Sequence, residues 1–208
     1  MKSDSFAVGG VLVARVSKEA KAQTHERIVV RASRLFREKG VEGISVSDIM
    51  AAAKLTHGGF YRHFSSKDEL AAAAIGRAID DTIRKLEEES ACLGAEAAVA
   101  AYFNRYLSAE HVAAADRGCV IAALASEAAR GVSPIREALA RGAERIIAAL
   151  ARGISGEPTE SRRKATAAFA TLVGTLLLAR SAGSRRAIDD VLAAGREAVE
   201  LCVSRTAP

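Results

Sequence analysis

Tryptophan is absent from this chain of 208 residues, and aromatic residues make up only 4% of it. Aromatic and β-branched residues favour strands, whereas Ala and Leu favour helices. Because the strand-favouring residues are scarce and Ala and Leu are abundant, the composition predicts a helical protein. Three prolines and 16 glycines are too few for a collagen-like or low-complexity chain. The hydrophobic share of 50% provides enough apolar surface to offset the entropy of folding. We therefore expect an all-α protein of one or two domains.

Cysteines and long hydrophobic runs are equally scarce. Cys92, Cys119 and Cys202 are spaced too widely for a disulfide framework or a metal cluster, so we expect free thiols and neither metal nor cofactor. The longest apolar stretch lies between Lys164 and Arg180, and it is shorter than the roughly 20 residues of a membrane span. The N-terminal apolar stretch is interrupted by glycines and lacks a cleavage site. These absences favour a cytoplasmic protein that makes no contact with a membrane.

The positive charge of the chain is concentrated near its N-terminus. The formal net charge is +5, from 30 Lys and Arg against 25 Asp and Glu. Residues 1–66 hold eleven basic and six acidic residues, whereas residues 67–208 hold equal numbers of each. This asymmetry predicts an N-terminal module that binds an anionic partner, followed by an electrically neutral domain.

Helical patterning in the basic region begins at Thr24 and ends at Gly40, where a glycine suits a helix C-terminus. Ser45 and Asp48 form a capping box that opens a short helix over residues 45–53. Thr56 is placed to cap a second short helix. Ser66 opens a long helix over about 67–89. Further start and stop signals predict helices over about 94–107, 109–115, 118–130, 134–153, 160–181 and 185–204.

The two short helices, joined by about three residues, have helix-turn-helix spacing, in which the second helix enters the major groove of DNA. That second helix contains Gly58 and Gly59, which weaken a helix but let its backbone approach a phosphate chain. Tyr61, His63 and Lys67 carry donors suited to phosphate oxygens. Thr56, His57 and Arg62 lie nearer the start and outer face of the helix, where base edges are reached.

Residues 24–70 resemble the DNA-binding domain of TetR/AcrR-type transcriptional regulators. The most specific part of the match is the string from Gly59 to Leu70, GFYRHFSSKDEL, at its distance from the preceding helix. The resemblance implies a homodimer that binds a palindromic operator in double-stranded DNA, usually to repress transcription. It implies a core role for Phe60 and Phe64, and DNA contacts by Ser45, Thr56, His57, Gly58, Gly59, Tyr61, Arg62, His63 and Lys67.

The resemblance divides the chain into a flexible leader (1–21), a helix-turn-helix domain (22–66) and a helical effector-binding and dimerisation domain (67–208). The leader carries Arg15, Lys18 and Lys21, so it is either an arm on the DNA or a solubilising tail. Apolar faces within about residues 160–204 predict a four-helix dimer interface, unless they form the core of a monomer.

A small-molecule effector site is a weaker expectation. Tyr102 and Tyr106 lie one helical turn apart, so they share a face that either lines a pocket or packs in the core. Cys119 follows a basic residue near a helix start, which favours a reactive thiolate, but a buried inert cysteine is the common alternative. The candidate effector residues are Tyr102, Phe103, Tyr106, His111, Cys119 and Glu127.

Two other functions remain open at this point. A non-specific DNA-binding protein would use the same basic module, although its charge is usually spread over the whole surface. A small helical enzyme would need a nucleophile–base pair, a metal cluster or a phosphate-binding loop, and none of these patterns is present in the sequence. We therefore expect no catalytic residue and no enzyme, and a regulator whose ligand changes the spacing of its two recognition helices.

Overall fold

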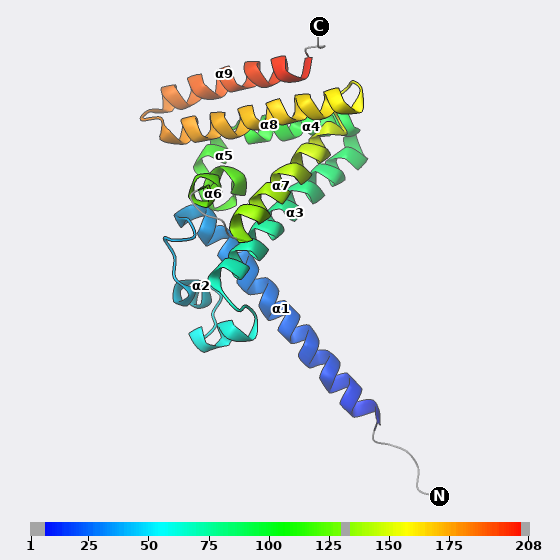
Figure 1. Ribbon diagram of the computed structural model, residues 1–208, viewed down its shortest axis with the longest axis vertical. Coiled ribbons are helices and arrows are strands. Elements are labelled where there is room, and N and C mark those ends of the chain that lie inside the picture. The colour runs from blue at the N-terminus through cyan, green and yellow to red at the C-terminus, as the bar shows by residue number, and fades with distance from the viewer. Residues whose placement is uncertain (1–6, 130–133, 205–208) are drawn as a thin grey trace, which may run out of the picture.

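The computed structural model describes residues 7–129 and 134–204, with side chains described from residue 18 onward. This part of the chain is helical and contains no strand (Figure 1), which confirms the all-α prediction. Its elements are α1 (Ala7–Lys39), α2 (Val46–Ala52), the 3₁₀ helix η1 (His57–Arg62), α3 (Lys67–Leu93), α4 (Ala95–Tyr106), α5 (Ala109–Ala113), the 3₁₀ helix η2 (Ala115–Arg117), α6 (Val120–Ala128), α7 (Pro134–Ala151), α8 (Pro158–Ser181) and α9 (Arg185–Ser204).

The N-terminal module is built on a buried aromatic core. Phe36 of α1 and Phe60 of η1 are each 1% exposed, and Phe64, after η1, is 3% exposed. The rings of Phe60 and Phe64 lie 5.8 Å apart between centroids, within the range of favourable aromatic pairs. Ile28 and Ile49 complete this core from α1 and α2. The predicted core role of both phenylalanines is confirmed, and it fixes η1 against α1 and α2.

The helix ends follow the predicted signals with two differences. Gly40 ends α1 at a φ of +76°, a conformation that glycine adopts without steric cost. Ser66 caps α3 through the Glu69 amide, but the Glu69 carboxylate accepts from the amide and hydroxyl of Ser65, the residue before the cap, rather than from Ser66. Thr56 stands at the predicted N-cap of η1, yet its side chain makes no capping hydrogen bond.

The Ser45 hydroxyl caps α2, and we expect its removal to cost stability. The hydroxyl accepts from the Asp48 amide at 3.1 Å, and the Asp48 carboxylate accepts from the Ser45 amide at 3.1 Å. Ser45→Ala is expected to lower the free energy of unfolding by about 1 kcal/mol, because an N-cap amide loses its acceptor. Urea denaturation measures this change. Thr56→Ala is the control, because Thr56 stands at the N-cap of η1 but its side chain makes no capping hydrogen bond, and equal losses in both variants would contradict the prediction.

The first helix begins earlier in the chain than the sequence predicts. A flexible segment over residues 1–21 and a helix start at Thr24 were expected, but α1 already begins at Ala7; residues 1–6 lie outside the described part. Residues 18–23 are exposed, so they show no apolar period by which sequence patterning detects a helix. Their alanines, lysines and glutamate are strong helix formers, and propensity rather than amphipathicity carries this part of α1.

The C-terminal helices form the upper part of the molecule in Figure 1. There α3 and α7 run side by side, and α8 and α9 lie against each other across the end of the bundle. A Cβ at Gly195 of α9 would come within 2.4 Å of Thr175 of α8, so glycine is needed where these helices meet. The predicted helices of this region agree with the structure to within a few residues. None of the described helices has the length and apolar character needed to cross a membrane.

Candidate functional site

The helix-turn-helix unit presents a polar face beside its aromatic core. The turn between α2 and η1 passes through Lys54, which has a φ of +56°, and the Leu55 amide donates to the Met50 carbonyl, as in a Schellman turn. Ser47 of α2 and His57 of η1 share a hydrogen bond of 3.0 Å, so the exposed sides of the two helices are joined. Ser47 was not among the predicted site residues, although its position one residue from the α2 start places it on this face.

Most of the predicted DNA-contact residues share this face. Tyr61 is 68% exposed, directly beside the buried Phe60, and its ring lies edge-on to Phe60. Neither Gly58 nor Gly59 has a positive φ, and a Cβ at Gly58 would meet no atom within 4 Å. Backbone conformation and packing therefore do not require these glycines. The exposed predicted residues are Ser45, Thr56, His57, Gly58, Tyr61 and Arg62; Gly59, His63 and Lys67 are half-buried.

Two of the predicted phosphate ligands have structural contacts of their own. The Lys67 ammonium donates to the carbonyls of Val41 at 3.0 Å and Ile44 at 3.4 Å, which leaves one N–H for another partner. His63 Nδ1 is buried without a hydrogen-bond partner among the described residues. Burial, and then the neighbouring His25, lower the pKa of His63, so the neutral ring is favoured there. Both side chains help to hold the module together, and their phosphate contacts stay predictions.

Glu127, one of the predicted effector residues, contacts the turn between α1 and α2. Its carboxylate, on α6, accepts from the amides of Val41 at 3.0 Å and Glu42 at 2.7 Å. The carbonyls of the turn between α1 and α2 therefore accept hydrogen bonds from Lys67, and the amides of the same turn donate hydrogen bonds to Glu127. We call this arrangement the Glu127 clasp. It connects α6 directly to the helix-turn-helix module.

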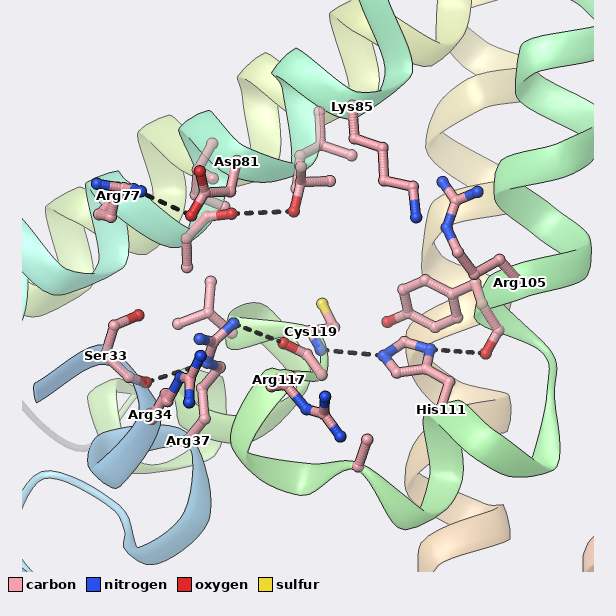
Figure 2. A pocket seen from close by; sticks show the side chains of 18 of the residues that line it. Ser33, Arg34, Arg37, Arg77, Asp81, Lys85, Arg105, His111, Arg117 and Cys119 are labelled. Atoms are coloured by element: carbon pink, nitrogen blue, oxygen red, sulfur yellow. Dashed lines mark hydrogen bonds and ion pairs between the residues drawn. The ribbon is translucent and has the colours of Figure 1, made fainter. Parts of the chain in front are cut away.

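A cavity of about 540 Å³ lies between α1, α3, α4 and the segment from Ser108 to Val120. Its volume suits a small organic ligand. Of the six predicted effector residues, four line it: Tyr102, Tyr106, His111 and Cys119. Figure 2 shows His111 and Cys119 on its wall. Phe103 does not line this cavity and packs against the core, because it lies on a different side of α4 from the tyrosines. With Glu127 in the clasp, the structure thus brings four of the six together.

His111 organises the wall of this cavity as a neutral ring. Its Nδ1 lies 2.8 Å from the Tyr106 carbonyl, and its Nε2 accepts from the Cys119 amide at 3.2 Å. Only the neutral ring with a proton on Nδ1 satisfies both contacts, because a proton on Nε2 would face the Cys119 N–H. Burial lowers the pKa of His111, opposed by the Tyr106 carbonyl, and Arg180 lowers it further. The half-buried Cys119 lies beside this ring, and its predicted thiol reactivity stays a prediction.

We expect His111 to make stability dependent on pH. Because the pKa is lowered on folding, the contribution of His111 is fully present above about pH 6.5, the unfolded value, and is lost as the pH falls through the lower folded value. The unfolding free energy of wild type minus that of His111→Phe should therefore shrink between pH 7.5 and roughly pH 5.5. Using the difference removes the contribution of His63, which titrates in both proteins. A difference that does not vary with pH would contradict the assignment.

Sequence patterning missed the charge of this cavity. Its cations come from four separate segments, so no local motif brings them together. Arg34 and Arg37 were counted with the DNA-binding charge of residues 1–66, yet they face this cavity (Figure 2). The other four cations lie in residues 67–208, where equal numbers of basic and acidic residues gave no sign of a local positive charge. The basic lining residues are Arg34, Arg37, Arg77, Lys85, Arg105 and Arg117.

Comparisons with known proteins bear on both parts of the chain. Residues 28–74 match the family model described as "Bacterial regulatory proteins, tetR family". The HTH-type transcriptional regulator YfiR of Bacillus subtilis (strain 168) is 28% identical over 43% of this chain and 44% of its own length. The HTH-type transcriptional repressor DhaR of Mycobacterium sp. (strain GP1) is 31% identical over 32% of this chain and 34% of its own. The matches thus span less than half the length of these relatives.

The fold of nearly the whole chain also has solved counterparts. A TetR-family transcriptional regulator from Agrobacterium tumefaciens superposes with a TM-score of 0.69 at 20% identity, over 88% of this chain and 99% of that one. At this identity the likeness concerns the fold. Similarity in sequence to the tetR family model lies in residues 28–74, which include the helix-turn-helix module. Over these residues the chain thus matches the model of the tetR family of bacterial regulatory proteins, and it shares the fold of a solved TetR-family member.

Proposed function

We propose that this protein is a sequence-specific, DNA-binding transcriptional regulator that acts as a ligand-released homodimeric repressor. One observation carries the proposal: η1 presents exposed polar side chains on a buried aromatic platform, within a module that matches the tetR family model. DhaR, which matches this module, is a transcriptional repressor. The family relationship favours the non-catalytic role, and binding to an operator implies a cytoplasmic location.

The contacts on DNA follow from the chemistry of the exposed face. Tyr61 offers a hydroxyl for a phosphate oxygen, while His57 and Arg62 offer donors for base edges in the major groove. Gly58 leaves room for backbone or water-mediated contacts. Lys21 of α1 lines a shallow groove with Arg62, so α1 supports the arm interpretation as a helix beside η1 rather than as a flexible tail.

Dimerisation would use α8 and α9. Leu177 (46% exposed) and Leu178 (65%) lie near the end of α8, and Leu201 (59%) lies near the end of α9. Because the two helices are antiparallel (Figure 1), these leucines mark opposite ends of the helix pair, and an interface along the pair would cover them all. Gly174, with open space around it, allows a close approach. Ala168 on the same helix is fully buried within the protomer, so it packs in the core. A dimer would place two copies of η1 to reach half-sites about 34–36 Å apart.

Release by a ligand requires two states with different affinities for it. The cavity of Figure 2 lies between α1 and the segment that leads into α6, and α6 ends in the Glu127 clasp on the helix-turn-helix module. A ligand that moves α6 would therefore move the α1–α2 turn. In a dimer such a shift would change the separation of the two recognition helices.

Selection from a pool of random DNA duplexes tests the proposal against its rivals. The full-length protein should enrich an inverted repeat with half-sites one helical turn apart, and one dimer should bind each site. A non-specific DNA-binding protein would enrich no sequence. Failure to retain any duplex at low salt would exclude DNA binding altogether and leave the helical-enzyme alternative. Arg62→Ala should relax the preference at one position of each half-site, whereas a loss of affinity with unchanged preference would move Arg62 to a phosphate.

A further inference from the structure

The cavity of Figure 2 holds more positive than negative charge. Six of its lining residues are Arg or Lys, and two, Asp81 and Glu110, are acidic. Three of the cations have carboxylate partners. Arg77 pairs with Asp81, Arg105 with Glu89 through both terminal nitrogens, and Arg117 with Asp116 at 3.6 Å. These pairs account for half of the positive charge.

The other three cations have no salt bridge within the described part of the chain. The guanidinium of Arg37 donates to the carbonyls of Ser33 at 3.0 Å and Gly118 at 3.2 Å. Burial lowers the pKa of Arg37, opposed by the Asp116 carboxylate, and the adjacent Arg34 lowers it further. Arg34 on α1 and Lys85 on α3 are both exposed toward the cavity from opposite walls (Figure 2). The lining therefore keeps an excess of positive charge, and a bound anion would relieve the repulsion between its cations.

Two buried hydroxyls in the same lining also lack partners. Ser33 and Tyr106 are each 4% exposed. Within the described residues neither side-chain oxygen meets the geometry of a hydrogen bond, although burial raises the pKa of the Tyr106 hydroxyl and the Cys119 thiol is close enough to raise it further. Leaving a buried hydroxyl unpaired costs about 1–3 kcal/mol, so such groups usually meet a water or a ligand. Both can donate to an anion. Apolar side chains complete the lining, among them Ile79, Val120 and Ile146.

We propose that this cavity binds a small organic anion, whose acidic group lies between Arg34, Arg37 and Lys85 and whose apolar part packs on Ile79, Val120 and Ile146. A carboxylate, sulfonate or phosphate accepts several charge-assisted hydrogen bonds at once, which the three unpaired cations and two free hydroxyls provide. An uncharged compound of the same shape would leave the cations unpaired.

That this anion is the effector rests on the proposed function. An acidic group near Arg37 would compete with the Gly118 carbonyl for the guanidinium and so loosen the link between α1 and the segment before α6. At its other end α6 carries the Glu127 clasp. The start of α6 therefore borders the anion site, and its end contacts the helix-turn-helix module.

Two fluorescent probes that differ by one sulfonate test the binding inference directly. 8-Anilinonaphthalene-1-sulfonate is an anion, and N-phenyl-1-naphthylamine is its neutral counterpart. Titrated into the full-length protein at constant salt, the anion should bind at least about tenfold more tightly, as expected for one charge-assisted hydrogen bond. The double variant Arg34→Gln/Lys85→Gln should lose this preference. Arg31→Gln is the matched control, because Arg31 is exposed on α1 and lies outside this cavity.

Each outcome decides the inference. A preference that disappears in the double variant and persists in Arg31→Gln supports it. Equal affinities for the two probes in the wild type overturn it, as does a preference that survives in the double variant or is lost equally in the control. Operator binding is measured separately on the wild type. A protein that shows the preference but retains no DNA would refute the proposed function and leave the anion site standing.

Discussion

Phe60→Ala is expected to lower the free energy of unfolding by about 3–5 kcal/mol, because it empties a buried aromatic site. Phe60 is 1% exposed, and its ring packs near Phe64 at 5.8 Å between centroids. The same ring is the platform of η1, so operator affinity should fall together with stability. Urea or guanidinium denaturation followed by circular dichroism measures the first effect, and fluorescence anisotropy with labelled operator measures the second.

Tyr61→Ala is the matched control, because it truncates the neighbouring aromatic residue on the same element. Tyr61 is 68% exposed, so stability should change by no more than about 0.5 kcal/mol. Operator affinity should nevertheless fall, since the hydroxyl is lost from the DNA face. Equal destabilisation by the two substitutions would contradict the assignment of Phe60 to the core and Tyr61 to the surface.

Glu127→Ala is expected to lower the free energy of unfolding by about 2 kcal/mol, because two amides lose a charged acceptor. The affected bonds are those to Val41 at 3.0 Å and Glu42 at 2.7 Å. Operator affinity should weaken as well, because the α1–α2 turn loses its connection to α6. Denaturation and anisotropy measure the two effects on the same protein.

Glu127→Gln separates the charge of the clasp from its geometry. The amide oxygen retains one acceptor, so this variant should fall between the wild type and Glu127→Ala in stability. Glu137→Ala on α7 provides a surface control, because among the described residues Glu137 forms an ion pair with the exposed Arg141 alone, an arrangement of small energetic value. If Glu127→Ala behaved like Glu137→Ala, the clasp would have no energetic role.

The helix-turn-helix module is the part of the fold that local sequence signals predict best. Ser45 and Asp48, Gly40, and the apolar spacing from Ile28 to Phe36 each act over a few residues, and the structure places them as expected. Helix ends in the second domain were predicted for the same reason. The early start of α1 was missed because an exposed helix has no apolar period, although its residues favour helix formation.

The contacts between distant segments were not predictable in this way. Glu127 lies 86 residues from the Val41 amide that it binds, and nothing near it in sequence indicates a clasp. The anion cavity combines cations from α1, α3, α4 and η2, which sequence arithmetic divided between two domains. Tyr102 and Tyr106 were found because they are one helical turn apart, a spacing that predicts a shared face without a known tertiary fold.

Sequence-specific DNA recognition predicts a large ratio between the affinities for two DNA duplexes. Fluorescence anisotropy at physiological salt would compare the selected inverted repeat with a shuffled duplex of the same length and composition. Specific regulators prefer their site by roughly 10³-fold or more, and we expect a ratio of at least this order, reduced when Arg62 is replaced by alanine. Equal affinities for the two duplexes, with the same dependence on salt, would contradict the account.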